Sequence, residues 1–362
     1  MVRTNGILAD RDIQALIDHD ILKAICAFDA DQIQPASLDL RLGNKAYRIR
    51  ASFMPGSNTK VSDKLERLKL HEFDLQDGAV LETGCVYLVP LLENLALPRT
   101  LSAVANPKSS TGRLDIFTRV ITDNAQEFDK ICIGYHGPLY LEISPRTFPI
   151  LVRTGSRLSQ LRFRQGKSYL NEVDLHDLHK SEMLVSEDFP NIDDGGIGLS
   201  IDLQGNENRL VGYRGKHHTS VIDVDKRAVA NVLDFWEPIY AHDDKTLILD
   251  PEEFYILVSR EAVRVPPLYA AEMTPFDPLV GEFRVHYAGF FDPGFGHMEA
   301  GGKGARAVLE VRSYKVPFIL EHGQIIGRLM YEHMLNRPCA LYGHDVGSHY
   351  QAQGLKLSKH FK

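Results

Sequence analysis

The chain repeats one sequence pattern at a fixed spacing, which restricts the folds open to it. Three pairs of stretches match with an offset of 168 residues: CVYLVPLLENLALP (85–98) with EFYILVSREAVRVP (253–266), LYLEI around Glu142 with AVLEV around Glu310, and ILVRTGSRLSQLRF with FILEHGQIIGRLMY. Further upstream, PASLDLRLG (35–43) matches GLSIDLQG (198–205) with an offset of 163 residues, so a small insertion separates the two anchors. A repeat of this length predicts two copies of one domain in tandem.

Each copy carries the pattern of β-strands. Short or alternating apolar runs such as VYLVPL, LYLEI, PILVRT and FYILVS are broken by Gly, Pro, Asn and Asp, which is typical of a β-sandwich or barrel. Helix is expected near the start, where Asp10 can cap a short helix with Ile13, Leu16 and Ile17 on its apolar face. We predict an all-β fold with a few short helices: a first copy (1–170), a polar linker (171–196) and a second copy (197–362).

Composition narrows the classes of function. With 44% hydrophobic residues and a net charge of −7, the chain predicts a globular protein whose ligands are small molecules and not nucleic-acid polymers. The four cysteines stand singly, no signal peptide precedes them, and the longest apolar runs are too short to cross a bilayer. These features favour a cytoplasmic protein with no membrane partner.

One stretch gathers an unusual number of hydrogen-bond donors. KSSTGR places Lys108, Ser109, Ser110 and Arg113 at a turn before a strand-like run. Hydroxyls, backbone N–H groups and two cationic side chains together suit the oxygens of a phosphate. The alternative is a polar turn whose serines cap local backbone groups.

A carboxylate inside an apolar strand pattern is the second candidate. Glu142 lies in GPLYLEISP, where an unpaired carboxylate would be costly, so it should have a partner or a chemical task. The alternative places Glu142 on the solvent face of an antiparallel strand. Glu310 holds the same position in the second copy. The paired motifs H-x-E and P-C-x-x-C of zinc deaminases do not occur, because Cys339 follows Pro338 with no second cysteine nearby.

Six stretches in order resemble one family. ILADRDIQALI, PASLDLRLGNK, KSSTGRL, GYHGPLYLEI, LVRTGSRLSQLRF and SHYQAQG are similar to stretches of the dCTP deaminases of the dUTPase-like superfamily, in the long bacterial form with a duplicated domain. The resemblance implies two distorted β-barrel (β-clip) domains, a homotrimer with nucleotide sites at interfaces, and conversion of dCTP and water to dUTP and ammonia without zinc. Mg²⁺ would be carried by the triphosphate.

The resemblance also assigns roles to residues. Glu142 is expected to be the catalytic acid and base, held with the attacking water by Arg113 and Ser109. Nucleotide and phosphate binding is expected of a larger set: Lys108, Ser109, Ser110, Arg113, Tyr135, Tyr350 and Gln353. The tail that carries Tyr350 and Gln353 is expected to be mobile when the site is empty and to order over a bound triphosphate.

The two copies depart from the family pattern in complementary ways. The first copy has Arg119 where the family has a histidine, and it lacks the family's Asp-Pro-Gly turn. The second copy keeps His286 and the turn that begins at Asp292, but TPFDPLVGEFR stands where the serines and arginine belong. We expect the first copy to be catalytic and the second mainly structural. A composite site that uses His286, Asp292 or Glu310 is the alternative.

Two other functions stay open at this point. The first is a dUTP diphosphatase, or a bifunctional enzyme that performs both steps, because AGFFD (288–292) resembles the aspartate turn of that relative. The second is a non-enzymatic nucleotide-binding regulator, which a diverged duplicate could become. The joint presence of Ser109, Arg113 and Glu142 argues against the regulator.

Overall fold

The computed structural model describes residues 3–275, 283–285, 289–343, 351 and 353–362, and within them the chain is built mainly of β-strands. The strands of the first copy are β1 (Gly6–Ile7), β2 (Leu22–Ala24), β3 (Ile33–Gln34), β4 (Ser37–Leu40), β5 (Lys45–Ile49), β6 (Lys69–Asp74), β7 (Ala79–Leu81), β8 (Val86–Ala96), β9 (Leu101–Pro107), β10 (Ile116–Thr122), β11 (Lys130–Ile131), β12 (His136–Pro145), β13 (Ile150–Val152) and β14 (Ser159–Gln165). The strands of the second copy are β15 (Ile192–Asp193), β16 (Gly196–Ser200), β17 (Leu210–Gly215), β18 (Ile222–Asp223), β19 (Trp236–Tyr240), β20 (Thr246–Leu249), β21 (Phe254–Val263), β22 (Tyr269–Pro275), β23 (Phe283–Val285), β24 (Phe290–Phe291), β25 (Ala305–Ser313), β26 (Phe318–Glu321) and β27 (Ile325–His333).

The helices are short. They are α1 (Asp10–Asp18), α2 (Val61–Leu68), α3 (Ser109–Gly112), α4 (Glu172–Glu182), α5 (Val232–Phe235) and the 3₁₀ turn η2 (Met298–Ala300). The prediction of an all-β fold with a few short helices is confirmed. Within the described part of the chain, every helix is too short or too polar to span a bilayer.

The same strand order occurs twice. The first copy forms one sheet with the order β11-β9-β14-β4-β3 and a second with the order β10-β12-β8-β5-β6. The second copy forms sheets with the orders β24-β22-β27-β16-β15 and β23-β25-β21-β17-β19. A small ribbon, β13-β7 or β20-β26, completes each copy. Equivalent strands thus pair in equivalent ways, as the sequence repeat predicts.

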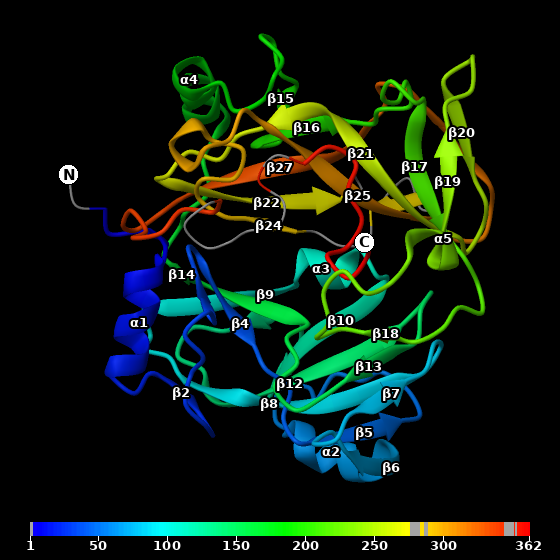
Figure 1. Cartoon of the computed structure of the whole chain (residues 1–362). Helices are drawn as coiled ribbons and strands as arrows, with labels where there is room; N and C mark the ends of the chain where they lie inside the picture. Colours follow the sequence, from blue (N-terminus) through cyan, green and yellow to red (C-terminus); the bar gives the residue numbers. More distant parts are fainter. Residues whose placement is uncertain (1–2, 276–282, 286–288, 344–350, 352) are drawn as a thin grey trace.

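Figure 1 shows the two copies stacked, with the first copy below and the second above. The core of the upper half is formed by buried side chains of the second copy, among them Leu257, Leu309 and Leu329. The lower core draws on both copies, because Trp236, Phe254 and Val308 join side chains of the first copy there. Strand β18 of the second copy also pairs in parallel with β13 of the first, with Ile222 opposite Ile150. The two copies therefore interlock.

Helix α1 forms where the sequence predicts it, with a different cap. Ile13 and Leu16 are buried on its inner face. The capping position is Ala9, whose backbone N–H donates to the Asp12 carboxylate over 3.0 Å. The Asp10 carboxylate instead accepts the backbone N–H groups of Cys339 and Ala340, each over 2.9 Å. Asp10 therefore joins the start of the chain to the second copy.

The segment predicted to be a linker contains helix α4. Its Leu175 and Leu178 are buried, and both belong to the core of the second copy. The Asn171 side chain caps the helix by accepting the Asp174 backbone N–H over 2.9 Å. The short apolar face is surrounded by charged residues and histidines, so the sequence of this segment reads as a polar connection.

Candidate active site

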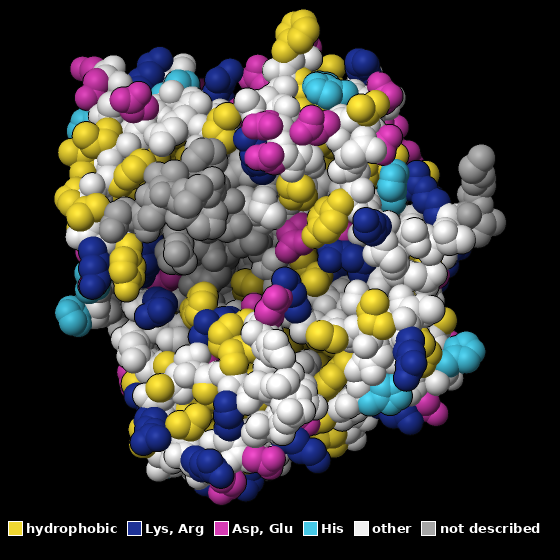
Figure 2. All heavy atoms as spheres, turned by 180° about the vertical axis from the view of Figure 1, so that it is seen from behind, with side chains coloured by type: hydrophobic (Ala, Val, Ile, Leu, Met, Phe, Trp, Pro, Cys, Tyr) yellow, Lys and Arg dark blue, Asp and Glu magenta, His cyan; other side chains and the backbone are white. Residues whose placement is uncertain are grey.

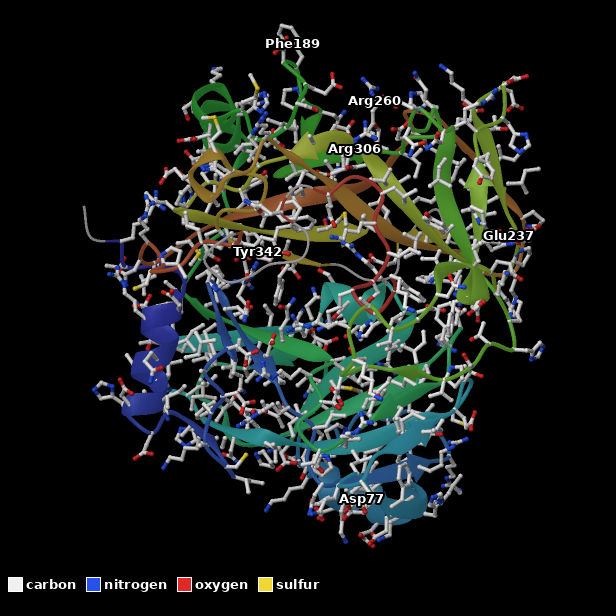
Figure 3. The ribbon with its side chains drawn as sticks, in the orientation of Figure 1. Asp77, Phe189, Glu237, Arg260, Arg306 and Tyr342 are labelled. Atoms are coloured by element: carbon white, nitrogen blue, oxygen red, sulfur yellow. The ribbon has the colours of Figure 1, made fainter. Side chains whose placement is uncertain are left out.

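A cavity of about 340 Å³ lies where the two copies meet, and both contribute to its walls. The residues that line it from the first copy include Asp39, Lys108, Ser109, Ser110, Arg113, Arg157 and Gln160. Those from the second copy include Arg227, Phe290, Asp292, Glu310, Tyr342, Gln353 and Lys359. Tyr342, labelled in Figure 3, lies between the two halves, whereas the labelled Asp77 and Phe189 mark their far ends.

The donor-rich turn forms one wall of the cavity. Strand β9 ends at Pro107, and Lys108 keeps an extended backbone that leads into the single turn of α3. The backbone N–H of Gly112 donates to the Lys108 carbonyl over 3.0 Å, which closes the turn. Lys108 and Ser109 are half-buried, whereas Ser110 is buried. The predicted phosphate motif is thus a compact turn with its polar groups at the cavity wall.

Arg113 connects the turn to the second copy. Its Nη2 atom donates to Gln353 Oε1 over 3.0 Å, and its Nη1 atom donates to the Lys356 carbonyl over 2.9 Å. Its Nε atom lies 3.8 Å from Oε1 of Glu310. The structure therefore places the arginine of the first copy beside the strand glutamate of the second.

Glu310 is a buried carboxylate on the cavity wall. It lies on β25 opposite Ile256 of β21, and it is 5% exposed. Burial raises the pKa of Glu310 to about 7, and the nearby Arg113 guanidinium opposes that rise. A carboxyl group with a pKa near 7 can both accept and return a proton at neutral pH.

Asp292 is the second buried carboxyl group of the second copy at the cavity. It accepts a hydrogen bond from Arg162 Nη2 over 3.0 Å, and the Arg162 guanidinium lies 4.0 Å from the centre of the Phe290 ring. Burial raises the pKa of Asp292, and Arg162 opposes the rise. Arg162 belongs to the first copy, so this contact also crosses between the copies.

Several cationic side chains line the same cavity. Lys108 forms an ion pair with Asp39, and Arg157 Nη2 binds Asp31 over 2.8 Å. Burial lowers the pKa of Lys359 to about 8, and the nearby Lys108 lowers it further. The basic side chains of the cavity can form charge-assisted hydrogen bonds with the oxygens of an anionic ligand.

The expected catalytic residue of the first copy lies elsewhere. Glu142 of β12 stands directly opposite Arg119 of β10, and its Oε1 atom accepts Arg119 Nε over 3.0 Å. The Arg119 guanidinium also donates to Ser52 over 2.6 Å and lies 3.7 Å from the centre of the Phe128 ring. Glu142 is not among the residues of the cavity that Ser109 and Arg113 line. This placement differs from the sequence-based expectation. Arg119, which stands where the family has a histidine, forms an ion pair with the Glu142 carboxylate.

The other predicted residues are divided. Gln353 lies at the cavity and accepts a hydrogen bond from Arg113. Tyr135 is not at the cavity, because its hydroxyl donates to the Pro138 carbonyl over 2.6 Å within its own turn. His286 and Tyr350 lie outside the described residues.

The end of the tail differs from the expected mobile segment. Leu357, Ser358, His360 and Phe361 are buried. The Ser358 hydroxyl donates to the Ser110 carbonyl over 2.8 Å, so the tail holds the donor-rich turn from outside. In Figure 1 this segment, drawn in red, descends beside α3, and the Phe361 ring packs against Phe235 of α5. The tail has few apolar residues, so its sequence does not indicate that it packs against the rest of the chain.

Sequence reasoning missed several basic and acidic groups at the cavity, among them Asp39, Arg157 and Arg227. Asp39 and Arg157 lie in stretches that match the family, so their place in those stretches was the available signal. Arg227 follows β18 in a segment with no recognised motif, and nothing in the sequence indicates it. The meeting of the first copy's turn with Glu310 of the second copy corresponds to the composite site that the sequence left open as the alternative.

Figure 2 shows the reverse face, on which basic and acidic side chains are interspersed. Among the described residues, no group of three or more His, Cys, Asp or Glu side chains is arranged to hold a metal ion. The four cysteines, Cys26, Cys85, Cys132 and Cys339, are free thiols.

Two family models together match nearly the whole chain. The model described as the 2′-deoxycytidine 5′-triphosphate deaminase (DCD) N-terminal domain matches residues 4–167. The model described as the C-terminal domain of the same deaminase matches residues 171–361. The boundary between the two models thus falls just before helix α4.

Solved and curated relatives agree with these matches. A crystal structure of 2′-deoxycytidine 5′-triphosphate deaminase from Agrobacterium tumefaciens is 72% identical, covers 93% of this chain and 100% of its own, and superposes with a TM-score of 0.89. A dCTP deaminase of Haloarcula marismortui is 35% identical over 45% of this chain and 82% of its own length. A protein of Methanothermobacter thermautotrophicus named "dCTP deaminase, dUMP-forming" is 33% identical over 44% of this chain and 78% of its own. These curated relatives match less than half of the chain.

Proposed function

Because the chain belongs to the family of 2′-deoxycytidine 5′-triphosphate deaminases, we propose that it hydrolyses dCTP to dUTP and ammonia in the cavity between its two copies. The observation that carries this proposal is the meeting of Arg113 from the first copy with Glu310 from the second. The substrate is dCTP as its Mg²⁺ complex, so the metal enters with the triphosphate and reduces its charge.

The walls of the cavity suggest how the nucleotide lies. The triphosphate binds at the turn of Lys108, Ser109 and Ser110, where hydroxyl and cationic groups meet. The pyrimidine then points toward Glu310 and Phe290 of the second copy. Gln353 keeps Arg113 in place between the two ends of the ligand.

Glu310 performs the proton transfers in this proposal. Its carboxylate takes a proton from water as the water oxygen adds to carbon 4 of the pyrimidine. It then gives a proton to the amino group, the bond between carbon 4 and nitrogen breaks, and ammonia leaves. Arg113 orients Glu310 and the water. A positioned acid and base of this kind typically accelerates a reaction by about 10²–10⁴-fold. Glu310 thus takes the role that the sequence analysis gave to Glu142, whose carboxylate is paired with Arg119.

A product assay with a pair of matched variants tests the proposal. Purified protein with dCTP and Mg²⁺ should release ammonia and dUTP. Glu310→Gln should lower turnover by at least about 100-fold and leave dCTP binding nearly unchanged, because the amide keeps the shape but cannot cycle protons. Glu142→Gln, the equivalent change in the first copy, should keep turnover. Loss of activity in Glu142→Gln alone would reverse the assignment of the copies.

A second candidate function comes from the names of the relatives. The Methanothermobacter relative is named dUMP-forming, so the dUTP made in the cavity could be hydrolysed further to dUMP and pyrophosphate. The same assay separates the two cases, because pyrophosphate appears only if the second step occurs. Measurable dCTP binding with no turnover would indicate a regulator.

Three further features belong to this proposal. The chemistry needs no zinc, since the sequence lacks the paired motifs of zinc deaminases, and elemental analysis of the active protein should find no stoichiometric zinc. The chain acts in the cytoplasm, which its singly placed cysteines favour. It assembles as a homotrimer, as the resemblance implies, which light scattering would test.

A further inference from the structure

The segments that carry Arg113 and Glu310 contact each other a second time, at Asp115 and Arg312, two residues after each of them. The Arg312 guanidinium forms an ion pair with the Asp115 carboxylate. Thr147 bridges the pair: its hydroxyl donates to Asp115 over 2.6 Å and accepts from Arg312 Nη2 over 3.1 Å. Asp115 and Arg312 come from different copies, and neither lines the cavity.

Asp115 combines a left-handed backbone with a buried carboxylate. Its φ angle is +55°, a left-handed conformation that costs free energy for residues other than glycine. Its side chain is 1% exposed, and a buried carboxylate is costly without a partner. Arg312 and Thr147 supply that partner. A left-handed backbone and a buried carboxylate both cost free energy, and such a residue persists where the surrounding contacts hold it in place.

The pair is well placed to fix the distance between the reacting groups. Glu310 and Arg312 are two residues apart on β25, so they lie on the same face of the sheet. Asp115 follows the donor-rich turn directly, and its backbone N–H donates to the Gly112 carbonyl over 2.9 Å. A shift of Asp115 relative to Arg312 would therefore also shift Arg113 relative to Glu310.

We propose that Asp115, Arg312 and Thr147 form a positioning cluster that holds Arg113 of the first copy at Glu310 of the second. This inference rests on the proposed function. The three residues touch neither the substrate nor the water, and they act through the alignment of the two catalytic segments. Misplacement of reacting groups by about 1 Å can lower a rate by about 100-fold.

A second ion pair between the copies offers a matched control. Arg164 is 16% exposed and pairs with Glu332, which is 0% exposed, whereas Arg312 is 18% exposed and pairs with Asp115, which is 1% exposed. Both arginines thus join a buried carboxylate across the same boundary, and neither lines the cavity. Substitution of either arginine should lower the free energy of unfolding to a similar degree, because each removes one ion pair between the copies.

The experiment compares Arg312→Met, Arg312→Lys and Arg164→Met with the wild-type chain. Urea unfolding and the kcat and KM for dCTP are measured for each. Both methionine variants should unfold at lower urea concentration, but only Arg312→Met should lower kcat, by about tenfold or more, with KM changed less than about threefold. Arg312→Lys keeps a positive charge for Asp115 and should recover part of kcat.

Thr147→Val is a milder variant that tests the positioning role if Arg312→Met does not fold. Its kcat should fall severalfold, because the bridge between Asp115 and Arg312 is lost. Unchanged kcat in Arg312→Met, or in Thr147→Val where only that variant folds, overturns the positioning role. Equal loss of kcat in Arg164→Met and Arg312→Met also overturns it. A wild-type chain that does not turn over dCTP refutes the proposed function instead, so the two failures are distinguishable.

Discussion

Glu142 and Glu310 occupy equivalent positions in the repeat, yet their surroundings give them different roles. Glu142 shares its carboxylate with Arg119 inside the first copy. Glu310 lies 3.8 Å from Arg113 and borders a cavity. The same residue type on the same strand is thus a structural ion-pair partner in one copy and the proposed acid and base in the other.

The environment of Glu310 predicts a pH-dependent stability difference. Its pKa in the folded chain is about 7, above its ordinary value of 4.5, so folding favours the protonated form. The corresponding stabilisation is complete below about pH 4.5 and is lost as the pH rises through about 7. Glu310→Gln should therefore be more stable than the wild type at pH 8, by about 3 kcal/mol, and similar to it at pH 4.5.

Thermal unfolding of both proteins from pH 4.5 to 8 checks this expectation. The difference between variant and wild type isolates Glu310, because the other titrating groups are present in both chains. A difference that stays flat across this range would show that the Glu310 carboxyl group ionises as easily in the folded chain as in the unfolded one.

Arg119 gives a second prediction for a single residue. Arg119→Met would leave the Glu142 carboxylate buried without its partner, which should lower the free energy of unfolding by about 3 kcal/mol. The turnover of dCTP per folded molecule should stay unchanged, since Arg119 and Glu142 border no part of the cavity. Urea unfolding and steady-state kinetics measure the two effects. The double variant Arg119→Met/Glu142→Gln should regain stability, and a large loss of turnover in either protein would assign catalysis to the first copy.

Among the structural elements, those with strong local patterns were predictable from the sequence. The strands around Glu142 and Glu310 follow from apolar alternation, and α1 follows from the spacing of Ile13 and Leu16. Helix α4 could not be predicted, because a short apolar face among polar residues resembles a linker until its packing partner is known. Likewise, the repeat gives no information about which copy's turn faces which copy's glutamate.

The tail shows how tertiary contacts outweigh local sequence. Phe361 is buried with its ring 5.5 Å from that of Phe235 and 5.9 Å from that of Trp236. Lys356 accepts a hydrogen bond from Arg113 through its carbonyl. The end of the chain is therefore part of the fold and also part of the support for Arg113.

Two variants of the tail should separate these contributions. Phe361→Ala should lower the free energy of unfolding by about 3 kcal/mol through lost packing and leave kcat/KM for dCTP within about threefold of wild type. Removal of residues 355–362 also removes the Lys356 carbonyl, and it should lower kcat/KM by at least about tenfold. Leu233→Ala, at a side chain that is 60% exposed, serves as the control. A truncated chain with normal stability and kinetics would show that the tail contributes nothing to fold or site.

In the molecule as a whole, the proposed function divides the site between the two copies. The first copy contributes the turn with Lys108 and Arg113, and the second contributes Glu310 and Asp292. The second copy also completes the lower core with Trp236. Neither copy alone places all of these groups at the cavity, so in the proposed function the two copies act as one unit.

This division predicts one nucleotide site per chain. The reciprocal site would need a phosphate-binding turn in the second copy, but the sequence there reads TPFDPLVGEFR and lacks the two serines that precede the arginine in KSSTGR. It would also need Glu142, but the Glu142 carboxylate is paired with Arg119, whose guanidinium packs against the Phe128 ring. Titration calorimetry of the Glu310→Gln variant with Mg²⁺ and dCTP should therefore give one bound nucleotide per chain, since this variant binds the nucleotide without consuming it. Arg113→Met, which keeps the side-chain bulk but removes the guanidinium, should weaken that single binding event by at least about tenfold, because a charge-assisted contact is lost. Two equivalent nucleotides per chain would mean that each copy forms a site of its own, and the composite cavity would then have to share its function with a second one.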